Sequence, residues 1–290
     1  MTKRAGSETV GIRLAHSPDA DDAFMFYALA TRKVHAPGLK FSHFLFDIET
    51  LNQEAERETY DVTAISFSAY PRVKEKYLLL DCGASFGDGY GPLVVAAKPL
   101  AAEDLGAYRV AVPGSMTTST LVLKLFAPSV RTVTMPFDKI LNGVKEGAAD
   151  AGLIIHEGQL TYAQFGLHRV IDLGAWWHQQ TGLPLPLGGN AIRRSLPRAV
   201  AVGAAQAIHE SIQYGLEHRE EALHYALEFA RDLDPDLADR FVGMYVNQWT
   251  LGYGEKGRRA VRELYERGSA ANLLPESAEP EFLEAETASP

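Results

Sequence analysis

The sequence predicts an α/β protein with two lobes and a ligand cleft between them. Short apolar runs alternate with helical patterns from the start of the chain, which is typical of a sheet covered by helices. The same alternation restarts near residue 109, and the chain from residue 196 onward is helical. The length of 290 residues also favours two units, since domains of about 150 residues are common.

The first part of the chain carries three strand–helix pairs. We predict strands at 11–17, 39–46 and 62–68, each followed by a helix, at 21–30, 48–57 and 69–77. Two more strands, at 77–85 and 91–97, flank the glycine-rich FGDGYG. We assign residues 1–96 to lobe 1.

The second lobe is inserted at residues 97–189. Its strands are predicted at 109–115, 130–135 and 150–157, and its helices at 119–127 and 137–148. LPLPLGGNAIRR (183–194) is predicted to be extended, because its prolines remove backbone donors and disfavour helix. Crossings between the lobes are expected near 92–98 and 183–193. Residues 190–290 return to lobe 1 with helices at 199–218, 220–233, 237–251 and 257–268.

Composition excludes several classes of protein. A formal net charge of -9 argues against nucleic acid as partner, because that binding needs a basic surface. No apolar stretch approaches the ~20 residues of a membrane span, and no signal peptide is visible, so we expect a cytoplasmic location. The single cysteine, Cys82, is interpreted as a small buried apolar residue.

Three loops after predicted strands carry polar residues suited to a ligand. In HSPDADDAF, Asp19, Asp21 and Asp22 either cap a helix or face a ligand at the carboxyl end of the first strand. D-A-D-D lacks the downstream ligands of a calcium loop, so no metal is expected. In VTAISFSAY, Ser66 and Ser68 either donate to a ligand or cap a helix.

The loop PGSMTTST has more hydroxyls than a helix cap needs. Ser115, Thr117, Thr118 and Ser119 lie where a strand gives way to a helix. Hydroxyl donors, free backbone N–H groups and the positive end of the helix dipole make an anion site there. The pattern fits a carboxylate better than a diphosphate. Plain capping is the alternative.

His156 ends the apolar segment AGLIIHE. H-E-G-Q-L lacks the second histidine of a zinc protease motif, and no nucleophile motif accompanies it. A structural histidine at a strand end and a lone general base at the lobe interface both stay open, with the structural role favoured on general grounds. If the strand continued, Glu157 would face the other way and would be no partner.

Taken together, these segments resemble a known family. HSPDADDAFMFYAL, DIETLN, GPLVVA, RVAVPG, AGLIIHE, DLGAWW and TGLPLPLG occur in an order similar to that of the 1,4-dihydroxy-6-naphthoate synthases. These act on cyclic dehypoxanthinyl futalosine in the futalosine route of menaquinone biosynthesis. The resemblance covers most of the chain and implies the two-lobed fold of the type 2 periplasmic binding proteins. It also implies a carbon–carbon lyase without cofactor, acting on a small anionic substrate.

The resemblance also assigns site residues. It implies that His156 is the proton acceptor, and that Thr117 and Thr118 bind substrate together with Ala64, Ile65 and Ser66. The first loop departs from the family pattern S-P-C-P-N-D-T-F. Asp22 is retained there as a binding residue, whereas Asp21 replaces an amide and Ala23 a hydroxyl.

Two other functions are weighed against this one. The chorismate dehydratase of the same pathway is similar in fold, but the first loop and GLIIHE favour the synthase. A solute-binding protein would need a signal peptide or a lipoprotein cysteine, and neither is visible. The sequence does not determine the oligomeric state.

Overall fold

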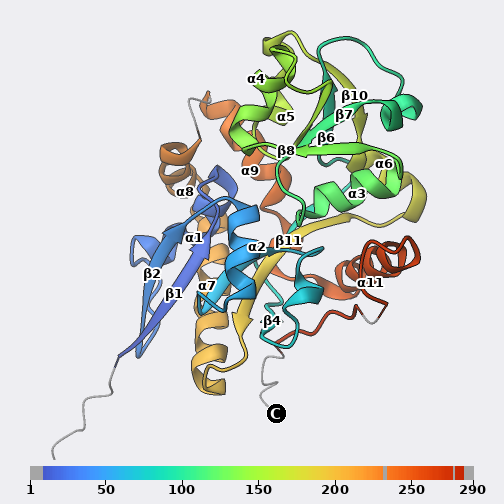
Figure 1. Cartoon of the computed structure of the whole chain (residues 1–290). Helices are drawn as coiled ribbons and strands as arrows, with labels where there is room; N and C mark the ends of the chain where they lie inside the picture. The colour runs from blue at the N-terminus through green and yellow to red at the C-terminus, as the bar shows by residue number, and fades with distance from the viewer. Residues whose placement is uncertain (1–8, 231–233, 277, 284–290) are drawn as a thin grey trace, which may run out of the picture.

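The chain folds around two separate β-sheets, as the computed structural model in Figure 1 shows. The structure describes residues 9–230, 234–276 and 278–283. We call the part built on the first sheet lobe 1 and the part built on the second lobe 2. Lobe 1 contains both the N-terminal strands and the long strand that follows lobe 2 in the chain.

The sheet of lobe 1 has the order β2-β1-β3-β11-β4, with β5 also pairing with β11. The first three strands are parallel to one another, whereas β11 runs antiparallel to β3, β4 and β5. Its strands are β1 (Val10–His16), β2 (Leu39–Leu45), β3 (Val62–Ser66), β4 (Tyr77–Leu79), β5 (Ser85–Gly87) and β11 (Leu185–Arg193).

The sheet of lobe 2 has the order β10-β6-β9-β7-β8. Strands β7, β8 and β9 are parallel, and β6 joins them antiparallel to β9. Its strands are β6 (Leu93–Ala96), β7 (Arg109–Val112), β8 (Arg131–Thr134), β9 (Ala151–Ile154) and β10 (His168–Asp172).

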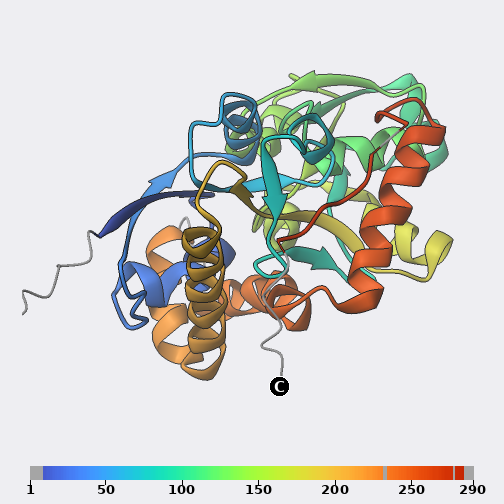
Figure 2. The same cartoon turned by 90° about the horizontal axis from the view of Figure 1, so that it is seen from below.

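Helices cover both sheets. Lobe 1 carries α1 (Ala20–Ala30) and α2 (Ile48–Glu56), and lobe 2 carries α3 (Thr118–Phe126), α4 (Ile140–Lys145), α5 (Gly158–Thr161) and α6 (Leu173–Thr181). The C-terminal helices are α7 (Arg198–Glu217), α8 (Arg219–Ala226), α9 (Pro235–Tyr245), α10 (Gln248–Leu251) and α11 (Gly254–Ala270). Figure 2 shows α7 and α8 gathered beside α1, while α11 lies apart from them at the other side of the molecule.

One apolar core runs through both lobes. It joins Ile65 and Phe67 of lobe 1 to Val94 and Leu121 of lobe 2, and all four are buried. Apolar side chains on one face of α3, spaced as an amphipathic helix requires, supply the lobe 2 side of this contact. The two lobes therefore share one buried apolar core.

The pairing of β6 and β11 moves both predicted lobe boundaries. β6 was assigned to lobe 1 by the boundary at 96, yet it pairs with β9 and β10 in the second sheet. β11 begins at Leu185 in the first sheet, ahead of the boundary at 189. Apolar content does not distinguish which sheet a crossing strand joins, because both sheets bury it equally.

Three predicted elements of lobe 1 were wrong, and one of them is the helix predicted at 237–251, which Val246 and Asn247 divide into α9 and α10. The helix predicted at 69–77 is a short 3₁₀ segment, Tyr70–Arg72, followed by turns, and the N–H groups of Arg72, Val73 and Lys76 bond to carbonyls three residues back. The strand predicted at 77–85 is divided into β4 and β5 by a turn in which Gly83 has a φ of +74°. Part of the helix predicted at 220–233 lies outside the described residues.

Two glycines allow the segment before β6 to pack closely against the start of α6. Gly91 precedes β6, and Gly174 lies in the first turn of α6. A Cβ on Gly174 would lie 1.9 Å from the carbonyl oxygen of Tyr90, and one on Gly91 would lie 2.9 Å from the Cα of Gly174. Main chain packs against main chain here, which only glycine permits.

Cys82 is buried, as expected, with 4% of its surface exposed. Burial, with a smaller effect of the Asp81 carboxylate, raises the pKa of its thiol to about 12. We expect 5,5′-dithiobis(2-nitrobenzoate) at pH 8 to label the thiol only after denaturant is added, because the thiolate is the reacting form. Prompt labelling of the folded protein would contradict this burial.

Candidate active site

A cleft between the two lobes collects most of the predicted site residues. Lobe 1 contributes the loop after β1, the end of β3 and part of β11, and lobe 2 contributes the start of α3. The cavity has a volume of about 130 Å³. Asp22, Ala64, Ile65, Ser66, Thr117 and Thr118 all line it.

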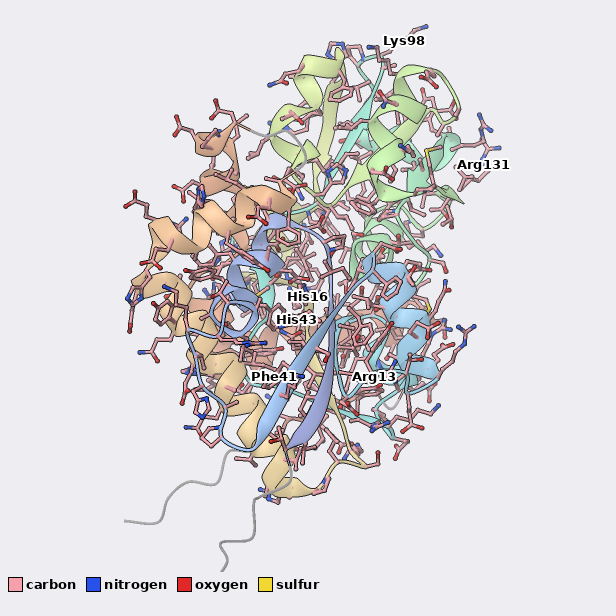
Figure 3. All side chains as sticks on the ribbon, turned by 90° about the vertical axis from the view of Figure 1, so that its left-hand side faces the viewer. Arg13, His16, Phe41, His43, Lys98 and Arg131 are labelled. Carbon is pink, nitrogen blue, oxygen red and sulfur yellow. The ribbon has the colours of Figure 1, made fainter. Side chains whose placement is uncertain are left out.

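A pair of histidines, of which His16 is buried and His43 half-buried, supports the first loop. His16 ends β1 and lies beside His43 of β2, as Figure 3 shows, with Nε2 of His16 3.1 Å from Nδ1 of His43. Nδ1 of His16 lies 3.0 Å from the carbonyl oxygen of Ser17 and donates to it. Burial, with a smaller effect of His43, lowers the pKa of His16 to about 3. The ring is therefore neutral at physiological pH and serves to hold the loop.

The three aspartates of that loop have different surroundings. Ser17 donates its N–H to Asp22 at 2.6 Å and its hydroxyl to Asp19 at 2.6 Å. Asp19 is at the N-cap position of α1 without a side-chain capping bond, so capping accounts for less of the cluster than expected. Burial, and then Asp22, Asp19 and Glu157, raise the pKa of Asp21 well above its ordinary value.

The Asp22 carboxyl predicts a pH dependence of stability. Burial outweighs the Ser17 hydrogen bond and raises its pKa from 3.8 to about 7. Between these values the folded protein binds more protons than the unfolded chain, so this group lowers stability as the pH rises through the window. We expect Asp22→Asn to raise the melting temperature by several degrees at pH 8 and by less at pH 4. Equal shifts at both pH values, or an equal effect of the exposed control Asp104→Asn, would contradict the assignment.

The hydroxyl groups of the two threonines at the start of α3 have different hydrogen-bond partners. Thr117 is the N-cap, and its hydroxyl is bonded to Gly114, Ser119 and Thr120 within its own loop. The hydroxyl oxygen of Thr118 accepts the N–H of Ser68 across the lobe interface at 3.1 Å. Thr118 can still donate its proton to a ligand, whereas the Thr117 side chain acts as a cap.

Two hydrogen bonds with Asn52 of α2 orient the Ser66 hydroxyl as a hydrogen-bond donor. The N–H of Ser66 donates to Oδ1 of Asn52 at 2.9 Å, and Nδ2 of Asn52 donates to the Ser66 hydroxyl oxygen at 3.0 Å. Asn52 is fully buried. Because the hydroxyl oxygen already accepts one bond, its own proton is directed to another acceptor, and Ser66 lines the cleft.

His156 is not itself among the residues that line the cleft, but it follows the lining residue Ile155, and its ring lies 5.4 Å from that of the lining residue Phe137. Its exposed fraction is 8%. Nδ1 accepts the N–H of Gly158 at 3.0 Å, so Nε2 carries the ring proton and donates to the carbonyl of Phe137 at 3.1 Å. A Cβ on Gly158 would come within 2.7 Å of the ring, which explains the glycine there. The lone pair that could take a proton is therefore on Nδ1.

The expectation that Glu157 faces away from His156 was wrong. Oε2 of Glu157 lies 3.7 Å from Nδ1 of His156, and its side chain is 4% exposed. The reason is that β9 ends at Ile154, so side-chain alternation no longer applies at these residues. A buried carboxylate beside Nδ1 stabilises the protonated imidazolium.

Several lining residues were not anticipated. Gly188, Gly189 and Asn190 come from β11, and Tyr245 comes from the end of α9. A Cβ on Gly188 would lie 3.1 Å from the carbonyl of Ile65, so the strand pair is closely packed at the wall. The double glycine within LPLPLGGN was the one local signal, whereas Tyr245 is carried by a helix far along the chain.

The chain matches a family model described as "menaquinone biosynthesis" over residues 12–270. It is 42% identical to a 1,4-dihydroxy-6-naphthoate synthase of Thermus thermophilus over 94% of this chain and 99% of the relative. The chain belongs to the menaquinone biosynthesis family.

Solved structures agree with this membership. A crystal structure of an Archaeoglobus fulgidus protein is 48% identical, with a TM-score of 0.88 over 91% of this chain and 98% of that one. A Candida albicans protein described as having the generic periplasmic binding protein fold is 15% identical, with a TM-score of 0.70 over 93% and 92% of the two chains. The predicted fold class is confirmed: this member of the menaquinone biosynthesis family has the fold of a periplasmic binding protein.

In residues 9–230, 234–276 and 278–283, no group of three or more His, Cys, Asp or Glu is placed to hold a metal ion. Within the same ranges, no helix of this menaquinone biosynthesis family member has both the length and the apolar character for a bilayer crossing.

Proposed function

We propose that this protein converts cyclic dehypoxanthinyl futalosine to 1,4-dihydroxy-6-naphthoate. Similarity to a synthase of that name along nearly the whole of both chains carries the proposal. The interlobe cleft, with hydroxyl donors on both walls and a histidine behind it, supports a small anionic substrate. The reaction class is a carbon–carbon lyase that uses no cofactor, and the proposed location is the cytoplasm.

His156 is the proposed general base. Its Nδ1 takes a proton from the sugar-derived part of the substrate in exchange for the Gly158 hydrogen bond. The Glu157 carboxylate at 3.7 Å stabilises the imidazolium that forms. Retro-aldol-like fragmentation then expels the sugar-derived part, and the remaining ring system becomes aromatic.

Hydroxyl groups position the substrate in this scheme. Ser66 donates from lobe 1 and Thr118 donates from lobe 2, each with its oxygen already occupied by a protein donor. In this scheme the substrate is held between two fixed hydroxyl donors, which lowers the entropy cost of reaching the reacting geometry. Asp22 and the first-turn N–H groups of α3 complete the proposed binding set.

The test is turnover by the purified protein. We expect cyclic dehypoxanthinyl futalosine to give a product with the absorbance and mass of 1,4-dihydroxy-6-naphthoate. Formation of a dehydrated product from chorismate instead would favour the dehydratase. Ligand binding by well-folded protein without product from either compound would favour a binding protein.

A further inference from the structure

Glu49 of α2 reaches across the lobe interface to the turn before α3. Its Oε1 accepts the N–H of Ser115 at 2.9 Å, and its Oε2 accepts the N–H of Met116 at 3.0 Å. The hydroxyl of Ser115 also donates to Oε1 at 3.2 Å, and the N–H of Met116 lies 3.3 Å from the same oxygen. Glu49 is 8% exposed, so these charge-assisted bonds lie away from bulk water.

The absence of a side chain at Gly114 leaves the space that the Glu49 carboxylate occupies. A Cβ on Gly114 would lie 2.2 Å from Oε2 of Glu49 and 2.3 Å from its Cδ. The backbone of Gly114 is not in the left-handed region, and the three atoms nearest to the added Cβ all belong to Glu49. The turn and the glutamate are therefore fitted to each other.

We propose that Glu49 is a positioning residue that fixes the Gly114–Ser119 turn and thereby the ligand-facing groups of Thr118. The inference rests on the function proposed above and adds a specificity element to it. Because Glu49 already holds the N–H groups of Ser115 and Met116, a ligand carboxylate is directed to the next donors, at Thr118 and Ser119, which line the cleft.

The contacts of the turn support this assignment of the Ser115 and Met116 N–H groups to Glu49 and of the later donors to a ligand. A helix N-terminus attracts carboxylates, and here the turn just before the N-cap, at Ser115 and Met116, already holds the carboxylate of Glu49. The hydroxyl oxygen of Thr118 accepts the N–H of Ser68 at the same time, so residues of lobe 1 hold both Thr118 and the turn before it. Removing Glu49 releases the N–H groups of Ser115 and Met116 without removing any group that is proposed to contact the ligand.

Amide hydrogen exchange tests the positioning directly. In Glu49→Ala we expect exchange at Ser115 and Met116 to quicken at least tenfold, because both N–H groups lose their acceptor. Glu54→Gln is the matched control, since Glu54 lies on the same helix and bonds Arg57 and Thr59 away from the cleft. If Glu49→Ala does not fold, Glu49→Gln keeps the shape and one acceptor, and the same direction is expected.

A double-mutant cycle tests the consequence for the ligand. Gly114→Ala in the native background is expected to raise KM for cyclic dehypoxanthinyl futalosine at least tenfold with kcat little changed, as loss of ground-state binding requires. In the Glu49→Gly background the same substitution is expected to cost much less, because Oε2, Cδ and Cβ of Glu49, the three atoms nearest the added Cβ at 2.2, 2.3 and 2.6 Å, are all gone.

Each result decides the inference. Unchanged exchange in Glu49→Ala overturns it, and so does an equal cost of Gly114→Ala in both backgrounds. Absence of turnover by the native protein overturns the proposed function, whereas the exchange measurement still decides whether Glu49 fixes the turn.

Discussion

Replacing His156 by asparagine is expected to reduce turnover of cyclic dehypoxanthinyl futalosine by about 10²–10⁴-fold, the contribution typical of a general base. Asparagine keeps an acceptor for the N–H of Gly158, which His156 receives at Nδ1, so the turn before α5 should persist. It has no lone pair basic enough to take the proton. Substrate binding should therefore change little, and the loss should appear in kcat.

The matched control is His178→Asn, at an exposed histidine on α6 that lies 3.7 Å from Asp88. This variant should turn over substrate at the native rate. Single-turnover kinetics and calorimetric titration together separate binding from the chemical step. A His156→Asn protein with native kcat would remove His156 from the mechanism.

Gly174→Ala is expected to destabilise the fold by about 3 kcal/mol or more, at the upper end of overpacking costs. The added Cβ would lie 1.9 Å from the Tyr90 carbonyl oxygen and 2.5 Å from the Gly91 nitrogen. These are main-chain atoms of the segment that enters β6, so no rotamer change can relieve the contact. Chemical denaturation measures the loss as a lower midpoint.

Ala175→Ser provides the comparison for that experiment. Ala175 is the next residue of α6 and is exposed, so its substitution should alter stability by no more than about 0.5 kcal/mol. Equal midpoints for Gly174→Ala and the native protein would show that the two segments can separate without cost.

Periodic patterns were sufficient to predict the α/β class and most of the strands and helices. Short apolar runs placed β1, β2 and β3 close to their observed limits, because each strand buries side chains in a sheet. The segment before His156 was misjudged at its end. Ile155 continues the apolar run, but the chain has already left the strand after Ile154 and is turning into α5.

The sequence could not predict contacts between distant residues. Glu49 and Ser115 are 66 residues apart and lie in different lobes, and DIETLN reads locally as a capped amphipathic helix. Likewise Thr117 and Thr118 are adjacent and chemically identical, yet one caps a helix and the other bonds the opposite lobe. Such differences arise from tertiary packing and leave no local periodic signal.

The contact between Gly91 and Gly174 limits how this chain can be recombined with its relatives. The segment entering lobe 2 and the helix near its exit meet main chain to main chain, so each accepts only a partner of matching backbone path. A chimera should therefore exchange both segments as one block, with junctions before Gly91 and after α6. A junction at 96, at the end of β6, would combine Gly91 from one protein with Gly174 from the other, so their main chains would no longer be matched.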